Sequence, residues 1–86
     1  MVSCVAVAPG GEPPRVAYAI GSRVGGAVAR NRVRRRLRAA TRSHAAVLEP
    51  GHAYLVGATP AAAGASYTDL STALHDALYA LREGRP

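Results

Sequence analysis

Tryptophan, phenylalanine and lysine are absent from this 86-residue sequence, and methionine and cysteine occur once each. The only aromatic residues of the FWY group are four tyrosines, so a core must rest on valine, leucine and isoleucine, because the abundant alanines bury little area each. The single Cys4 excludes an internal disulfide and a thiolate metal cluster. These absences describe a small domain that depends on aliphatic packing.

Long apolar runs are missing as well. No stretch approaches the ~18 consecutive apolar residues of a membrane-spanning helix. The start also lacks a charged leader followed by a long apolar run. We therefore expect a cytoplasmic protein without a membrane partner.

Acidic residues are few, and their positions argue against a protein-borne nuclease site. The five carboxylates are scattered, and no pair is placed to hold magnesium for phosphodiester cleavage. His44 lies on an apolar helix face, and His52 and His75 have no partners at metal-ligand spacing. We expect Cys4 to pack inside a strand. The sequence thus predicts no catalytic side chain and no metal site.

What the chain does contain is positive charge. The formal net charge is +6, and all eleven basic residues are arginine. Guanidinium groups stay charged and match phosphate oxygens two at a time, which lysine cannot do. Such a balance indicates an anionic partner, with a polyphosphate backbone as the natural candidate.

Seven of the arginines lie between Arg30 and Arg42, and their order predicts an amphipathic helix that ends near Leu48. At ~100° per residue, one narrow stripe is apolar. Its members are Ala29, Val33, Leu37, Ala40, His44 and Val47. The opposite side carries Asn31, Arg34, Arg35, Arg38 and Arg42. Arg32 and Arg36 fall on one shoulder and Arg30 on the other.

The remaining segments predict a single α+β domain over residues 1–86, with the order β-β-α-β-α and a three-stranded core sheet. We expect strands at 2–8, 15–20 and 53–58, and a last helix that is capped by Ser66 and frays at Gly84. The first two strands should pair as an antiparallel hairpin around the turn at 9–14. Val16, Tyr18 and Ile20 should face the helices. Glycines 21, 25 and 26 suggest a permissive turn rather than a phosphate cradle.

The stretch from Ile20 to Arg38 resembles the signature of the protein component of bacterial ribonuclease P. The Arg30-Asn31-Arg32 triplet is its most specific part. Val24-Gly25 and Ala27-Val28 precede the triplet, and a basic run follows it. The resemblance extends over nearly the whole chain.

The resemblance implies a function that composition cannot give. The protein would bind the catalytic RNA subunit, ribonuclease P RNA, and assist removal of the 5′ leader from precursor tRNA. The RNA would supply catalysis and hold most of the Mg²⁺. It also implies a left-handed β-α-β crossover, although right-handed connections are the general rule. The implied RNA-binding residues are Arg23, Arg30, Asn31, Arg32, Arg34, Arg35 and Arg38.

This chain departs from the family pattern in several places. Gly21, Gly26 and Thr59 replace residues that are usually polar or cationic. The family begins with a helix that this sequence does not show, so we expect an N-terminally shortened form. The sheet face of Ala17 and Ala19 would then be uncovered, open to the substrate leader or to self-association.

Two other classes of function are alternatives to this interpretation. A general RNA- or DNA-binding module, such as a ribosomal-type protein, would employ the same arginines. A stand-alone nuclease is disfavoured by the scattered carboxylates.

Overall fold

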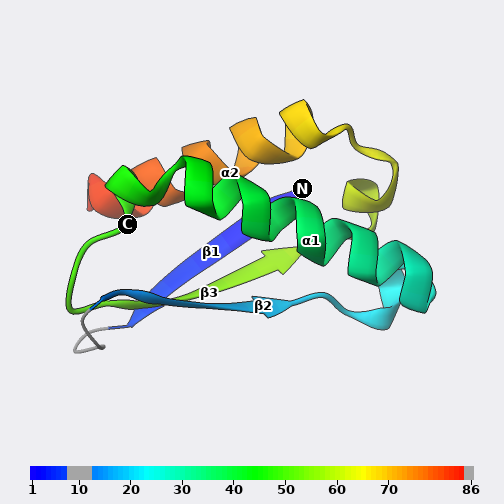
Figure 1. Ribbon diagram of the computed structural model, residues 1–86, viewed down its shortest axis with the longest axis horizontal. Coiled ribbons are helices and arrows are strands. Elements are labelled where there is room, and N and C mark those ends of the chain that lie inside the picture. The colour runs from blue at the N-terminus through cyan, green and yellow to red at the C-terminus, as the bar shows by residue number, and fades with distance from the viewer. Residues whose placement is uncertain (8–12, 85–86) are drawn as a thin grey trace.

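The computed structural model describes residues 1–7 and 13–84. Five main elements follow in the order predicted from the sequence: β1 (Val2–Val7), β2 (Arg15–Ala19), α1 (Ala27–Ser43), β3 (Ala53–Ala58) and α2 (Tyr67–Arg82). Three short 3-10 turns connect them: η1 (Ser22–Val24), η2 (Ala45–Val47) and η3 (Pro60–Gly64). Both helices lie on the same side of the sheet, which leaves the other side open (Figure 1). The α+β class is confirmed.

The strand pairing differs from the predicted hairpin. The sheet order is β1-β3-β2, so β3 is central and β1 does not pair with β2. β1 is antiparallel to β3, with Val2 opposite Ala58, and β2 is parallel to β3, with Tyr18 opposite Val56. The turn that was expected between the first two strands falls mostly on residues 8–12, outside the described residues.

The length of the connection between β1 and β2 allows the two strands to lie on either side of β3. Seven residues separate β1 from β2. They can extend over more than about 20 Å, whereas passing over a central strand requires only two strand spacings, about 10 Å. The central position gives β3 hydrogen-bonding partners on both edges, which an outer position would not. The passage from β2 through α1 to β3 is the left-handed crossover that the resemblance implies (Figure 1).

The core fills the space between the sheet and the two helices. Val33, Leu37 and Ala40 of α1 are completely buried, as the apolar stripe predicted. From α2, Leu70, Leu74 and Leu78 meet them. β3 contributes Tyr54 and Val56, and the helix-facing residues of β1 and β2 pack around this centre.

Cys4 belongs to that packed layer, as expected from its place in a strand. It is half-buried and packs against the core. Desolvation by burial raises the pKa of the Cys4 thiol from 9.0 to about 11. The thiol is therefore protonated near neutral pH, which does not favour nucleophilic chemistry.

α1 ends earlier than the sequence suggested. It stops at Ser43 rather than near Leu48, and Ala45–Val47 continues as the 3-10 turn η2. Close to this end, Thr41 and Ser43 donate side-chain hydrogen bonds to the carbonyls of Leu37 and Ala39. Such bonds to the preceding turn compete with regular helix geometry. Val47 and Leu48 still pack against the core, so the apolar stripe outlasts the helix.

The turn before α1 requires a glycine at one position. Gly25 has φ 149°, a conformation that side chains rarely adopt. An added Cβ would also lie 2.9 Å from the Cβ of Ala29. The interpretation as a permissive turn therefore holds for Gly25, whereas Gly21 and Gly26 have ordinary negative φ values that other residues also adopt. Ser66 caps α2 as predicted, accepting a hydrogen bond from the Asp69 amide at 3.1 Å.

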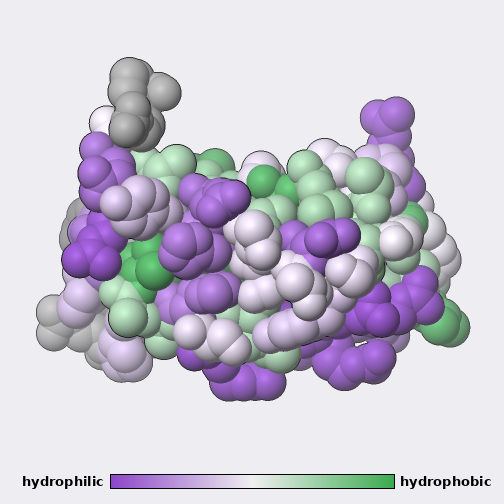
Figure 2. Space-filling model, turned by 90° about the horizontal axis from the view of Figure 1, so that it is seen from above, coloured by the Kyte–Doolittle hydropathy of each residue, from purple (hydrophilic) through white to green (hydrophobic). Residues whose placement is uncertain are grey.

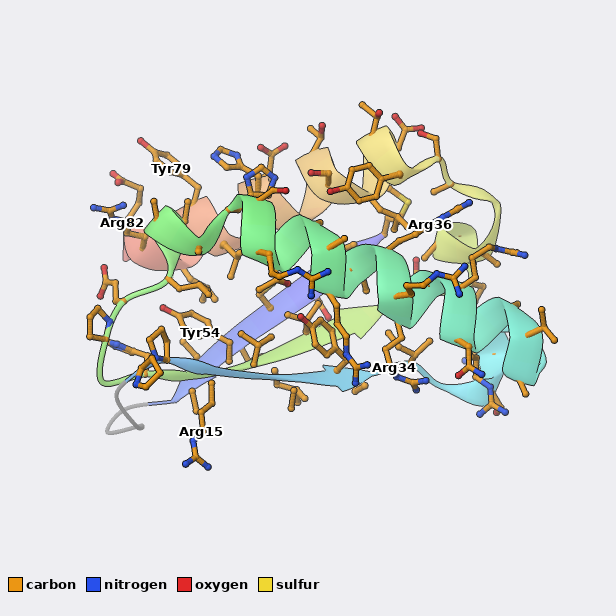
Figure 3. The ribbon with its side chains drawn as sticks, in the orientation of Figure 1. Arg15, Arg34, Arg36, Tyr54, Tyr79 and Arg82 are labelled. Atoms are coloured by element: carbon orange, nitrogen blue, oxygen red, sulfur yellow. The ribbon has the colours of Figure 1, made fainter. Side chains whose placement is uncertain are left out.

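The sheet face away from the helices is shallow and largely apolar. Val5 and Leu55 are 54% and 47% exposed, and they are register neighbours across β1 and β3. Leu55 is also paired with Ala17 of β2, on the edge of β3 away from β1, and both Ala17 and Ala19 are exposed. Arg15 extends from this face away from the helices (Figure 3).

A pair of leucine substitutions tests this division into core and open face. Leu37→Ala should lower the free energy of unfolding by roughly 2–5 kcal/mol, because it leaves a cavity at a completely buried site. Leu55→Ala should cost less than about 1 kcal/mol, because Leu55 is already half exposed. Urea denaturation followed by circular dichroism measures both, and equal losses would contradict the described layering.

No helix within residues 1–7 and 13–84 is both long and apolar enough to span a membrane.

Candidate nucleic-acid interface

One flank of α1 forms a cationic hollow of about 530 Å³. Its lining residues are Asn31, Arg34, Arg35, Arg38 and Arg42. These positions are spaced three, one, three and four residues apart, so one side of a helix presents all of them. We call this set the arginine face. Figure 3 shows Arg34 on the side of α1 nearer β2, and Figure 2 shows hydrophilic patches on the molecule viewed from the helical side.

No carboxylate of the described residues pairs with the arginine face. Among the described residues the ion pairs are His52–Glu49, His75–Asp76 and Arg82–Glu49, and none of them involves α1. Within the face, Arg34 donates to the side-chain oxygen of Asn31 at 3.0 Å. Like charges at three- and four-residue spacing repel one another, so an external anion would stabilise this helix.

Tyr18 of β2 lies against the arginine face. The guanidinium carbon of Arg38 is 5.7 Å from the centre of the Tyr18 ring, within the range of a cation–π interaction. The Tyr18 hydroxyl donates to Thr41 Oγ1 at 2.8 Å, and Thr41 Oγ1 in turn donates to the Leu37 carbonyl at 2.8 Å. Thr41 is only 8% exposed. β2 and α1 are thereby joined by a short polar chain.

Two arginines of α1 bind the protein itself instead of lining the hollow. Arg36 donates to the Ala65 carbonyl at 3.0 Å, and Arg32 donates to the Ala63 carbonyl at 3.4 Å. These carbonyls belong to η3 and the residue after it, directly before α2. Figure 3 shows Arg36 on the opposite side of α1 from Arg34. The shoulder of the helix is thus used to hold the entry to α2.

The three residues of the triplet Arg30-Asn31-Arg32 lie in three different environments. Asn31 is exposed and lines the hollow, whereas Arg32 points to η3. Arg30 is half-buried, and its Nε is shielded from solvent without a hydrogen-bond partner among the described residues. Arg23 is exposed in η1, outside the set that lines the hollow. The structure therefore places four of the seven predicted site residues together: Asn31, Arg34, Arg35 and Arg38.

Two members of this surface were not among the predicted site residues. Arg42 completes the arginine face: helical periodicity places it on the cationic side, but the family resemblance does not include it among the RNA-binding residues. Tyr18 contacts Arg38 from a strand twenty residues earlier, and no local pattern predicts that contact.

The described residues do not bring together three histidine, cysteine, aspartate or glutamate side chains in a group that could hold a metal ion. His44 instead packs between the helices, with its Nε2 2.9 Å from Ser71 Oγ and its ring 5.0 Å from that of His75. Within residues 1–7 and 13–84, the side chains therefore do not form a site that fits a magnesium ion.

The fold and the arginine face together define a class: a small basic α+β domain with an uncompensated cationic flank that suits a polyanion. Comparison with known proteins makes the class specific. A family model described as Ribonuclease P matches residues 2–82. The chain belongs to this ribonuclease P protein family.

Individual relatives agree with the family match. The chain is 41% identical over 81 residues to the ribonuclease P protein component of Beutenbergia cavernae, covering 94% of this chain and 68% of that protein. It is 42% identical over 78 residues to the component of Thermobifida fusca, covering 90% and 53% respectively. The chain thus spans about half to two-thirds of the length of these curated relatives.

Solved structures agree on the fold. The RNase P protein from Thermotoga maritima has a TM-score of 0.80 at 17% identity, covering 91% of this chain and 74% of that chain. The Staphylococcus aureus RNase P protein has a TM-score of 0.67 at 19% identity, with coverage of 84% and 62%.

Neighbouring arginines of α1 provide a test of the two roles. Arg36→Ala should lower the free energy of unfolding by about 1 kcal/mol, because the Ala65 carbonyl loses its charged donor. Arg35→Ala should leave stability unchanged or raise it slightly, because it removes one repelling charge from an exposed site. Thermal unfolding at low salt compares them, and a larger loss for Arg35→Ala would contradict the assignment.

Proposed function

We propose that this chain is the protein subunit of ribonuclease P and docks on the catalytic RNA through the arginine face. The observation that carries the proposal is the cationic hollow on α1, which has no carboxylate partner among the described residues, in a chain of the ribonuclease P protein family. Phosphate groups of an RNA strand would supply the missing counter-charge at regular spacing.

The proposed RNA contacts follow from the donors that line the hollow. Arg34, Arg35, Arg38 and Arg42 present guanidinium groups that bind phosphate oxygens in pairs. Asn31 offers a donor and an acceptor, which suits a base edge or a ribose hydroxyl. Arg23, Arg30 and Arg32 remain proposed contacts through the resemblance, with Arg32 using the donors that its bond to Ala63 leaves free.

In this proposal the RNA subunit performs catalysis and the protein assists it. Precursor tRNA is the substrate, its 5′ leader is removed in the cytoplasm, and Mg²⁺ is held by the RNA. The protein lowers the salt or magnesium concentration needed, because its arginines offset repulsion between phosphate backbones that must lie close together. The described side chains offer the protein no metal-binding group of its own.

A pair of single-charge variants tests the docking surface. Arg35→Ala should weaken binding to ribonuclease P RNA and reduce the log–log salt slope by about one, because one phosphate contact is lost. Arg82→Ala removes the same charge from α2, where Arg82 contacts Glu49, and should leave the slope unchanged. Filter binding across a salt series measures both. An unchanged slope for Arg35→Ala would refute docking through this face.

Two controls separate the alternatives. A general RNA-binding module would bind unrelated structured RNA of equal length as tightly as ribonuclease P RNA, whereas the subunit should prefer the latter. A stand-alone nuclease would cleave precursor tRNA after all RNA has been removed from the preparation, and the proposed subunit should not.

The open face of the sheet is the proposed contact for the substrate leader. Ala17 and Ala19 are small and exposed, so an extended strand can approach the sheet closely. Exposed Val5 and Leu55 beside them offer an apolar surface for unstacked bases. The same apolar surface gives the isolated protein a route to self-association when no RNA covers it.

A charge on this face distinguishes leader contact from simple docking. Ala17→Asp should reduce the affinity for precursor tRNA severalfold in the assembled complex and leave that for mature tRNA unchanged, because the carboxylate repels the leader phosphates. It should also suppress self-association in sedimentation experiments. Ala80→Asp, at an exposed site on α2, is the matched control. Equal precursor-to-mature ratios in both variants would exclude this face.

A further inference from the structure

We infer that Tyr18 is a positioning residue for the RNA-docking surface: it holds the Arg38 guanidinium in place on the arginine face. The inference rests on the proposed function and adds a strand residue that the sequence motif does not contain. Three observations carry it: the ring contact to Arg38, the hydrogen-bonded chain to α1, and the contrast with the other tyrosines.

The ring contact determines where the Arg38 side chain lies. Arg38 is exposed, and a free arginine side chain populates many rotamers that must be lost when it binds phosphate. The Tyr18 ring supports its guanidinium at 5.7 Å, on the flank where Arg34, Arg35 and Arg42 line the same hollow. A group that is already held there loses less entropy on binding.

The hydroxyl fixes the ring to the helix that carries Arg38. Tyr18 donates to Thr41 Oγ1, and Thr41 donates to the Leu37 carbonyl, with both distances 2.8 Å. Leu37 and Thr41 bracket Arg38 along α1 and are themselves buried. The ring is thus tied to the same turn of helix from which Arg38 projects.

The other tyrosines have different surroundings. The Tyr54 hydroxyl accepts a hydrogen bond from the Glu49 amide at 2.9 Å, inside the fold. Tyr67 and Tyr79 are 39% and 50% exposed on α2. Among the described residues, the tyrosine that forms a cation–π contact is Tyr18, with Arg38.

The test is a double-mutant cycle on affinity for ribonuclease P RNA, with all proteins shown to be folded by circular dichroism. Tyr18→Leu should weaken binding roughly two- to fivefold, the range expected for a partly exposed cation–π contact. Tyr18→Phe keeps the ring but loses the bond to Thr41, so it should weaken binding less than Tyr18→Leu does. In an Arg38→Ala background, Tyr18→Leu should have no further effect. Tyr79→Leu is the matched tyrosine control.

A second readout needs no RNA. The Arg38 Nε–H signal in a ¹⁵N correlation spectrum should carry a ring-current shift in the wild type and in Tyr18→Phe, and lose it in Tyr18→Leu. A merely structural tyrosine would lower the melting temperature without this pattern.

The outcomes separate this inference from the proposed function. Three results would each overturn the inference: wild-type affinity for Tyr18→Leu, an equal loss of affinity in the Arg38→Ala background, or the absence of the ring-current shift. The proposed function would still stand in each case if the wild-type protein prefers ribonuclease P RNA to unrelated RNA. A wild type that binds ribonuclease P RNA no better than unrelated RNA overturns the proposed function and this inference with it.

Discussion

The structure depends on a balance within α1 between charge repulsion and apolar burial. Seven arginines repel one another along this helix, which nevertheless packs against the sheet. The force that opposes this repulsion is the burial of a single apolar seam. Val33, Leu37 and Ala40 are completely buried against α2 and β3, so the helix cannot turn or detach without exposing them. Because no carboxylate within the described residues pairs with α1, the repulsion between its arginines is not offset by ion pairs, and an external anion can reduce it. Binding of a polyanion would therefore stabilise the fold as well as form the complex.

The arginines of α1 are not equivalent, although the sequence shows them as one basic run. The side toward β2 leaves Arg34, Arg35 and Arg42 in an open hollow, and the side toward η3 directs Arg32 and Arg36 to backbone carbonyls. A guanidinium that donates to a carbonyl stabilises the connection to α2 and has fewer donors left for a ligand. Net charge thus overstates the part of the helix that is free to bind, and the direction of each side chain decides its role.

Sequence patterns over a few residues correctly predicted the features that depend on neighbours along the chain. The apolar stripe, the cationic side of α1 and the Ser66 cap all follow from spacings of three or four residues, and the structure has them where the sequence placed them. Contacts between distant segments were not accessible in this way. The antiparallel hairpin was wrong because alternation within β1 and β2 says which face is buried and not which strand is the neighbour. The bond from Arg36 to Ala65 and the contact between Tyr18 and Arg38 likewise join segments whose proximity only the fold creates.

The register of β2 on β3 is the feature that brings these surfaces together. Tyr18 lies opposite Val56 and faces the helices, so its neighbours Ala17 and Ala19 must face the open side of the sheet. β2 is an edge strand, with α1 on one side and the shallow apolar face on the other (Figure 1). A shift of one residue would exchange the two sets, burying an alanine beneath Arg38 and exposing the tyrosine on the sheet. The register of the parallel pairing between β2 and β3 therefore determines two features together. It places Tyr18 beneath Arg38 of the arginine face, and it places the small side chains of Ala17 and Ala19 on the open face of the sheet.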